Sequence, residues 1–427
     1  MTFRFLHAAD VHLGNRQYGR PERQSDFARA FRDLTLTAID RSVDAVLIAG
    51  DMFHKRNVDA RTFVQSVVLL QRLQEHGITV LAIEGNHERP FFSEGQSWLE
   101  ALDNLGLLRL LSGYYQEGEL KLPPYSQEYH RGAFVELKGV RIYGQSYVGT
   151  TTPLVVHDLA QRLAMDYASD ATPAPYTILM LHTGLGGVLE HYSTNVFRET
   201  LEVLRPYVNY LALGHIHKPF SQDDWLYNPG SLENNSANEV EWDERGYYIV
   251  EVEPGDPPRH RATLHRSLRR PYLRLRFSVE PYADPDALYA ALTHELKRLS
   301  RDGKPVLELR LYGVLNFRRQ DLDMTHIQQM AEAIVDPLLC QIQDMIRSNV
   351  FDIRVDDEMS RADMERLVLS DLAGNDLRRR PHAQQWSEAA LRIKQLALDQ
   401  STPESIIAVL EQLLTETASL SDEGEDA

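Results

Sequence analysis

The chain has 427 residues, too many for one ordinary hydrophobic core, so two or three domains are expected. Its formal net charge of −17, taken alone, argues against a nucleic-acid partner, because an acidic surface repels phosphate. The single cysteine, Cys340, excludes an intrachain disulfide and a thiolate metal cluster. The N-terminal stretch MTFRFLHAADVH lacks the features of a signal peptide, and no apolar run reaches membrane-span length, so we expect a cytoplasmic protein.

Roughly the first 250 residues alternate short apolar runs with helical patterns, which indicates an α/β arrangement. Residues 60–77 are typical of a helix, and residues 133–147 of a hairpin that turns at Lys138-Gly139. Buried strands are predicted at residues 3–10, 44–51, 79–86, 176–183 and 209–215. The stretch EPGDPPRH, residues 253–260, is predicted to be the end of this domain.

The rest of the chain is predicted to begin with a small β-α-β-α domain. Apolar and polar side chains alternate at residues 272–277 and 306–313, which predicts two strands. Residues 326–346 are predicted to be a helix interrupted at Pro337. A last helix begins at Thr402-Pro403 and carries one apolar stripe, made of Ile406, Leu410, Leu413 and Leu414. Three regions are predicted: a domain at 1–255, a basic linker with the small domain at 256–352, and a helical region at 353–427 with an acidic disordered tail at 421–427.

Polar side chains follow all five predicted strands of the first domain. They are Asp10 and His12; Asp51 and His54; Asn86, His87 and Glu88; His182; and His215 with His217. The carboxyl ends of strands in open α/β sheets are where ligands bind, and the glycines beside these residues permit sharp turns. Each short motif is weak or moderate by itself, but all five in this order indicate a shared site.

The residue types indicate a site for two metal ions. Imidazole, carboxylate and amide ligands without sulfur favour manganese, with iron or zinc as alternatives. A carboxylate can bridge two ions, and such a pair activates a water for attack on phosphorus and stabilises the charge that develops on the phosphate. The two histidines of GHIH, His215 and His217, would then each take a different ion.

The same stretches resemble the calcineurin-like metallophosphoesterases over roughly residues 3–253. HAADVHLG, LIAGDMFHKRNVD, EGNHE, HTG, LGHIHKPF and YNPGSLE are similar to the DNA-repair nuclease branch, which includes the SbcD-type subunit of the bacterial SbcCD nuclease and its archaeal and eukaryotic equivalents. The resemblance implies an α/β fold in which two sheets are flanked by helices in a four-layer sandwich. It also implies a small α+β capping domain and a C-terminal helical segment.

The resemblance further implies a role for each site residue. One metal would be held by Asp10, His12 and His217, the other by Asn86, His182 and His215, with Asp51 bridging them. His87 would lie over the scissile phosphate as an acid or transition-state stabiliser, and His54 would help to position the DNA backbone. The expected activity is hydrolysis of DNA phosphodiesters by a nuclease, exonuclease or endonuclease, of a double-strand-break repair complex.

The implied partners are double-stranded DNA ends, an SMC-like ABC ATPase of the SbcC type and a second copy of the chain. No membrane partner is implied. The implied location is the nucleoid. No nucleotide-binding P-loop is present, so any ATP dependence would come from the partner. The C-terminal apolar stripe either packs on its own chain or fits a groove of that partner.

Seven arginines in residues 256–276 are either solvated linker residues or a contact strip for the DNA backbone. As candidate DNA-binding residues they are Arg259, Arg261, Arg266, Arg269, Arg270, Arg274 and Arg276. In the loop at 227–246, Asn228 and Ser231 are expected to serve ordinary turn chemistry rather than to touch substrate.

Two other functions are compatible with the sequence. GNHER, ending the third motif with Glu88 and Arg89, is close to what Ser/Thr protein phosphatases carry, whereas an aspartate is frequent at this place in the nuclease branch. Those phosphatases follow the second aspartate with VDRG, which GDMFHKR does not match. A phosphatase or small-molecule phosphodiesterase is thus the first alternative. A non-catalytic scaffold is the second, and the complete ligand set argues against it.

Overall fold

The computed structural model divides the chain into two units, Met1–Tyr272 and Leu273–Ala427, and each is described by itself. The residues that it describes are 2–89, 95–169, 174–189, 196–242, 244–253, 255, 257–300, 302–348, 360–374 and 382–422. The predicted acidic tail therefore lies outside the described residues from position 423 onward.

The first sheet of the first unit has the strand order β14-β13-β1-β2-β3-β4. Its strands are β1 (Phe3–Ala8), β2 (Ala45–Ala49), β3 (Thr79–Ile83), β4 (Arg109–Leu110), β13 (Gly246–Glu253) and β14 (Arg259–Arg266). The strands from β1 to β4 pair in parallel, whereas β13 is antiparallel to both β1 and β14. The carboxyl ends of β1, β2 and β3 therefore meet at one edge.

The second sheet has the order β11-β12-β10-β9-β8-β7. It consists of β7 (Phe134–Leu137), β8 (Val140–Gln145), β9 (Tyr176–His182), β10 (Tyr210–Gly214), β11 (Phe220–Gln222) and β12 (Leu226–Asn228). The predicted hairpin at 133–147 is confirmed, because β7 pairs antiparallel with β8 and both turn residues, Lys138 and Gly139, have positive φ. A separate small ribbon joins β5 (Tyr114–Gln116) to β6 (Glu119–Lys121).

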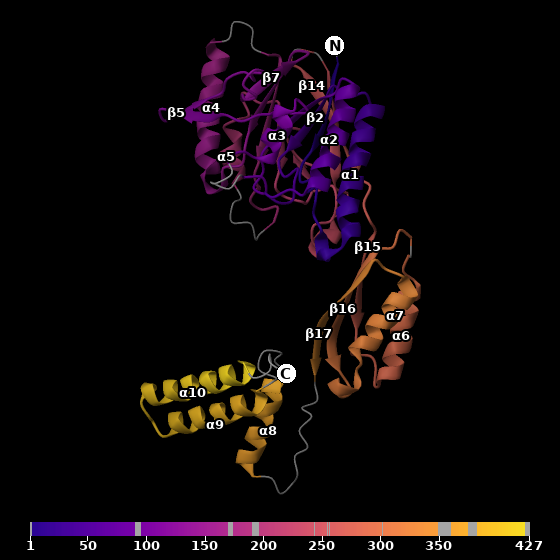
Figure 1. Ribbon diagram of the computed structural model, residues 1–427, viewed down its shortest axis with the longest axis vertical. Helices are drawn as coiled ribbons and strands as arrows, with labels where there is room; N and C mark the ends of the chain where they lie inside the picture. The colour runs from indigo at the N-terminus through magenta and orange to yellow at the C-terminus, as the bar shows by residue number, and fades with distance from the viewer. Residues whose placement is uncertain are drawn as a thin grey trace. The chain divides into compact units, whose positions relative to one another are not determined.

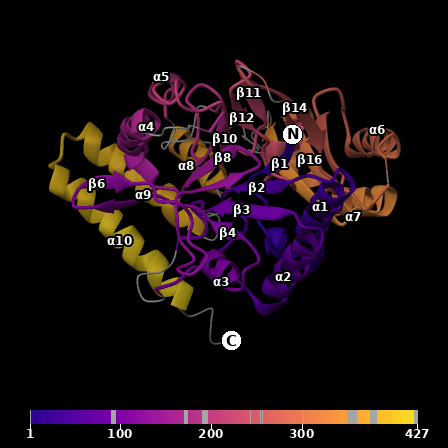
Figure 2. The ribbon, with the colours of Figure 1, turned by 90° about the horizontal axis from the view of Figure 1, so that it is seen from above.

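The two sheets pack face to face and are covered by helices on their outer faces. Side chains such as Phe5, Leu47 and Ile178 fill the space between the sheets. The first sheet is covered by α1 (Pro21–Asp40), α2 (Ala60–Glu75) and α3 (Trp98–Asn104), and the second by α4 (Thr152–Ser169) and α5 (Arg198–Glu202). Figures 1 and 2 show α1 and α2 on one flank of the strands and α4 and α5 on the other. The predicted four-layer α/β sandwich is thus confirmed.

The expected domain boundary at residue 256 was placed too early. Residues 259–266 form β14, which pairs with β13 along its whole length, so this part of the basic run is an edge strand of the first unit. The alternation of Ala262 and Leu264, which pack toward the space between the sheets, with Arg261 and Thr263 explains why a basic segment forms a strand here. The first unit ends at Tyr272.

The second unit contains a three-stranded sheet in the order β15-β16-β17. The strands are β15 (Tyr272–Ser278), β16 (Val306–Leu315) and β17 (Leu339–Ser348), and the helices α6 (Pro285–Lys297) and α7 (Met324–Val335) pack on the sheet through their leucine, isoleucine and valine side chains (Figure 1). The prediction of a helix across 326–346 is wrong beyond Val335. Asp336 takes the left-handed conformation and Pro337 cannot continue a helix, so residues 339–348 instead pair in parallel with β16. The order is therefore β-α-β-α-β.

In the described residues from 360 onward, three helices follow: α8 (Arg361–Gly374), α9 (Ala383–Leu398) and α10 (Pro403–Asp422). The predicted start of the last helix at Thr402-Pro403 is confirmed, but its predicted stripe is divided. Leu413 packs with α9, together with Val409 from outside the predicted stripe, whereas Leu410 and Leu414 are exposed. Among the described residues, no helix combines the length and the apolar character needed to cross a membrane.

One buried histidine joins the two sheets behind the site. His7 of β1 is fully buried, and its Nε2 donates a hydrogen bond to the carbonyl oxygen of Leu213 at 3.1 Å. Its Nδ1 accepts a hydrogen bond from the hydroxyl of Tyr210 at 3.0 Å. Burial lowers the pKa of His7 to about 3, so the ring is neutral in the folded protein.

This histidine is expected to make the fold sensitive to acid. Below pH 6.5 the unfolded chain binds a proton at His7 that the folded chain does not, so the free energy of unfolding falls by about 1.4 kcal/mol per pH unit down to about pH 3. In urea unfolding between pH 7 and 5, His7→Gln should show a shallower loss of stability than the wild type. Gln replacement of the exposed His76 should leave the slope unchanged, and equal slopes for all three proteins would contradict the assignment.

Candidate metal centre

The loops that follow the central strands have strained backbones. Asp10, His12, Asp51 and His215 all have positive φ, at 52°, 50°, 53° and 89°. Residues other than glycine rarely adopt this conformation, and it clusters at functional sites where surrounding contacts enforce it. Here the amide of Asp10 donates to the carbonyl of Gly50, and the amide of His215 donates to the carboxylate of Asp10 at 3.0 Å. These bonds hold the loops of both sheets together.

Four side chains form a first cluster at this point. His12 and His217 bring their Nε2 atoms to within 3.1 Å of each other. Nε2 of His217 lies 3.7 Å from a carboxylate oxygen of Asp10, and Nε2 of His12 lies 3.9 Å from one of Asp51. Asp10, His12 and Asp51 are buried, and His217 is only 17% exposed.

A second cluster shares Asp51 with the first. The same oxygen of Asp51, Oδ2, lies 3.5 Å from Nε2 of His182. Oδ1 of Asn86 lies 3.1 Å from Nε2 of His182 and 3.0 Å from Nδ1 of His215. The structure thus brings all seven predicted ligands together in two adjoining groups, with Asp51 common to both.

The donor set fits metal ions. Nδ1 of His182 donates to the carbonyl of Ala49, and Nδ1 of His217 is 2.8 Å from a carboxylate oxygen of Glu239, to which it donates. Nε2 of each ring therefore faces the carboxylate or amide oxygens of the site. Against the effect of burial, the nearby carboxylates raise the pKa of His182 to about 9 and that of His217 to about 8, so each Nε2 can carry a proton toward these oxygens. A metal ion would take the place of that proton, and the nitrogen and oxygen donors suit one.

The pKa values follow from burial and from the two aspartates. Burial lowers the pKa of His12 well below its usual value and that of His215 to about 3, so both rings are neutral ligand groups. Burial raises the pKa of Asp10 to about 6. Burial opposes the charge of Asp51 as well, but the neighbouring His182 and His12 hold its pKa below the ordinary range. The charge of Asp51 likewise raises the pKa of His182 to about 9, against the effect of burial.

His87 and His54 lie at the open side of the clusters. Nδ1 of His87 donates to the carbonyl of His54 at 2.5 Å, which fixes the ring and leaves Nε2 3.9 Å from Asp51. Nδ1 of His54 lies 3.4 Å from Nδ1 of His12. A hollow of about 550 Å³ opens here, and it is lined by His54, Lys55, Arg56, Asn57, Asn86 and His87. Both predicted catalytic histidines therefore border space that a substrate can enter.

Comparison with known proteins agrees with this site. Residues 3–219, which contain every residue of the two clusters, match the calcineurin-like phosphoesterase family. The chain belongs to the calcineurin-like phosphoesterase family. It is 31% identical over 266 residues to the DNA double-strand break repair protein Mre11 of Haloferax volcanii, with 61% of this chain and 52% of that protein covered.

Two other curated relatives carry the same description. The Mre11 protein of Archaeoglobus fulgidus is 32% identical over 244 residues, which cover 56% of this chain and 52% of the relative. The Mre11 protein of Aeropyrum pernix is 30% identical over 311 residues, which cover 66% and 71%. The chain thus spans about half the length of the Haloferax and Archaeoglobus relatives.

The residues that hold His217 are not among the predicted site residues. Glu239 binds His217 on one side and accepts from Arg245 and Ser231 on the other, at 2.5 and 3.1 Å. Asn228 donates from Nδ2 to the carbonyls of Ile216 and Lys218, which flank His217. Asn228 and Ser231 are fully buried, so they hold the loop and do not reach a substrate, as expected. The loop's sequence carries no periodic signal that could have identified Glu239.

Several of the seven candidate DNA-binding arginines make contacts within their own unit. Arg270 binds the buried Asp26 at 2.6 and 2.9 Å, and Arg274 binds the buried Glu308. Arg276 stacks on Tyr312, and Arg266 pairs with Glu244 at 3.5 Å, so these arginines also have partners within their own unit. These contacts show that part of the basic run serves internal ion pairs, and DNA contact by the seven arginines stays a prediction.

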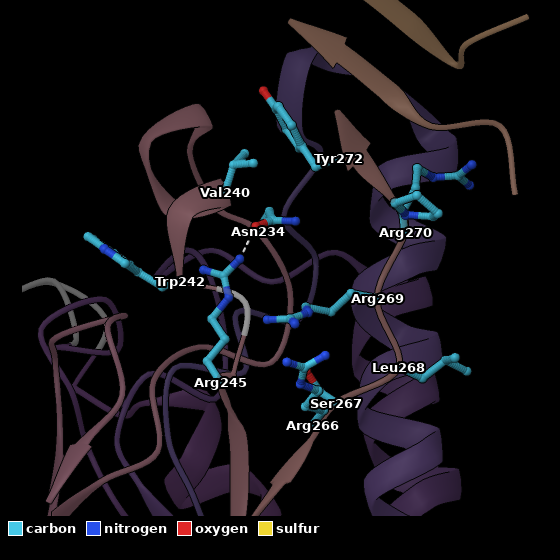
Figure 3. A pocket seen from close by; sticks show the side chains of 11 residues that line it. Asn234, Val240, Trp242, Arg245, Arg266, Ser267, Leu268, Arg269, Arg270 and Tyr272 are labelled. Atoms are coloured by element: carbon cyan, nitrogen blue, oxygen red, sulfur yellow. Dashed lines mark hydrogen bonds between the residues drawn. The ribbon is translucent and has the colours of Figure 1, made fainter. Parts of the chain in front are cut away.

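Four of the seven arginines lie at two ends of the first sheet. Arg259 and Arg261 of β14 lie opposite Glu253 and Glu251 of β13, beside the first residues of β1. The rise per residue of a strand places them about 20 Å from the carboxyl end of β1. Arg266 and Arg269 lie at the other end, where the metal clusters are. They line a pocket of about 270 Å³ whose wall includes Arg245 (Figure 3).

The shared position of Asp51 predicts a specific pattern of metal binding. In titration calorimetry with Mn²⁺, Asp51→Ala should weaken both sites by more than about 100-fold, because loss of an outer hydrogen-bonding partner alone costs about 10–100-fold. His217→Ala should weaken one site and spare the other. Replacement of the exposed Asp40 by Ala should leave two sites intact. Loss of a single site in Asp51→Ala would contradict the shared position.

Proposed function

We propose that this chain is a metal-dependent DNA nuclease, the nuclease subunit of a double-strand-break repair complex. The observation that carries the proposal is the pair of histidine-rich clusters that share Asp51 at the edge of an open hollow bordered by His87. The similarity to Mre11 proteins supports DNA as the substrate.

In this proposal each cluster would hold one divalent ion. Asp10, His12 and His217 would hold the first, Asn86, His182 and His215 would hold the second, and Asp51 would be a ligand common to both. The chemistry that such a pair would supply is an activated water for attack on phosphorus and stabilisation of the charge on the phosphate. Every ligand atom is nitrogen or oxygen, which supports manganese over softer ions. Zinc and iron are the alternatives that a metal analysis would distinguish.

His87 is proposed to act on the leaving group. Its Nδ1 hydrogen is committed to the carbonyl of His54, so its Nε2 is the atom that can hold a proton at the side of the hollow. A proton held there can pass to the departing sugar oxygen as the bond to phosphorus breaks. His54 shapes the same wall, and with Lys55 and Arg56 it is proposed to position the DNA backbone.

Further DNA contacts are proposed at Arg266 and Arg269, which lie at the same end of the first sheet as the clusters. Contacts from Arg259 and Arg261 are not part of the proposal, since they lie at the opposite end. The β15–β17 domain is proposed to cap the DNA, which rests on the family resemblance and on its place in the chain.

Two protein partners complete the proposal. The helices α9 and α10 expose Leu398, Ile407, Leu410 and Leu414, an apolar surface suited to the groove of an SMC-like ABC ATPase. A homodimer is supported by Val64 and Val68, which are exposed one turn apart on α2. A place in the cytoplasm, at the nucleoid, follows from the proposed substrate.

The phosphatase alternative rests on the GNHE motif and on the acidic net charge, and the position of Glu88 bears only on the first of these. Glu88 is 5% exposed and turned toward the backbone of the loops, so this residue does not line the hollow. Glu88 in place of the aspartate frequent in the nuclease branch is therefore compatible with DNA as the substrate. A simple aryl phosphate ester remains the comparison substrate that separates the two functions.

Degradation of an end-labelled DNA duplex with added Mn²⁺ tests the proposal. The wild type should release nucleotides, and His87→Ala should be slower by about 10²–10⁴-fold, the usual contribution of a general acid, with its metal content unchanged. Replacement of the exposed His157 on α4 by Ala should leave the rate unchanged. The proposal would be refuted if the wild type binds its metals and cleaves an aryl phosphate ester but leaves DNA intact. The assignment to the phosphoesterase family would still hold.

A further inference from the structure

Glu88 follows His87 directly but faces the opposite way. Its carboxylate accepts three backbone hydrogen bonds: Oε2 from the amides of Asp51 and Gly85, at 3.1 and 2.8 Å, and Oε1 from the amide of Phe53, at 2.9 Å. Asp51 and Phe53 belong to the loop after β2, and Gly85 belongs to the loop after β3. One buried side chain thus ties together the two loops that carry Asp51, Asn86 and His87.

The two loops are in very close contact at this point. A Cβ on Gly85 would lie 2.0 Å from Oδ1 of Asp51 and 2.5 Å from its amide nitrogen, so only glycine fits. Asp51 itself has a φ of 53°, and its Oδ1 accepts from the amide of His87 at 3.0 Å. The position of the Asp51 carboxylate therefore depends on a strained backbone, and its amide is one of the three that Glu88 binds.

We propose that Glu88 is a positioning residue of the metal centre, whose carboxylate fixes the backbone of Asp51 against the loop of Asn86 and His87. This inference rests on the proposed dinuclear site. It assigns the last residue of GNHE to the placement of the shared ligand and not to the choice of substrate.

The length and the acceptor chemistry of Glu88 both matter for this role. Aspartate is shorter by one methylene, so its carboxylate cannot reach donors on both loops from the same backbone position. Glutamine has the same length, but its amide nitrogen would face the amide of Phe53 or those of Asp51 and Gly85. Either change leaves a buried N–H without an acceptor, which is costly.

Mn²⁺ affinity of the full-length protein tests the inference by titration calorimetry, with the thermal midpoint measured alongside. Glu88→Gln and Glu88→Asp should each weaken Mn²⁺ binding by about 10–100-fold, the range for residues that orient metal ligands. The ratio of the cleavage rates of an aryl phosphodiester and an aryl phosphomonoester should stay as in the wild type, because Glu88 does not reach the hollow.

Asp103 supplies a matched control. It is a buried carboxylate of the same unit that accepts a backbone hydrogen bond, from Leu110 at 3.0 Å, and it belongs to neither metal cluster. Asp103→Asn should lower the thermal midpoint and leave Mn²⁺ affinity unchanged. This variant separates a general loss of stability from an effect on the metal ligands.

Three results would overturn the inference. Mn²⁺ affinity as in the wild type in both Glu88 variants would reduce Glu88 to a structural role, while the proposed function would stand. A folded wild type that takes up no Mn²⁺ would remove the dinuclear site itself, and the inference with it. A changed ratio of diester to monoester cleavage at unchanged affinity would make Glu88 a determinant of specificity instead and would also overturn it.

Discussion

The metal centre depends on how closely the two sheets approach each other at the carboxyl ends of β2 and β10. A Cβ on Gly214 would lie 2.2 Å from the carbonyl oxygen of Ala49, and one on Gly50 would lie 2.3 Å from Nδ1 of His182. Only glycine permits this approach. It lets His182, from the second sheet, donate to Ala49 of the first at 2.8 Å, so ligands from both sheets converge on Asp51.

Buried carboxylates behind the ligands hold this geometry in place. Glu239 orients His217 from the loop after β12, and Glu88 holds the backbone of Asp51 from the loop after β3. Both carboxylates accept hydrogen bonds from donors beside the metal ligands. These bonds help to hold a region in which several residues have positive φ. Outer residues of this kind set the direction and the basicity of metal ligands, so the site extends well beyond the atoms that would touch an ion.

The open side of the centre is built differently from its closed side. His87 lies at the edge of the hollow with its ring fixed by the carbonyl of His54, while the next residue, Glu88, is turned inward. Adjacent residues of one short motif thus serve opposite sides.

The sequence by itself determined the α/β class, the five central strands and the polar residues at the strand ends, because hydrophobic periodicity and strand-end residues are local features. The choice of seven of these residues as metal ligands came from the family resemblance. Local patterns predicted a helix after Pro337, but residues 339–348 pair with β16 as a strand. They also placed the basic segment 259–266 in a linker, whereas it pairs with β13 as an edge strand. Glu239, Glu88 and the ion pairs of Arg270 and Arg274 were decided by tertiary structure alone. Their partners lie far apart in sequence or on the backbone, and no local pattern records which distant donor a buried carboxylate will meet when the loops close around it.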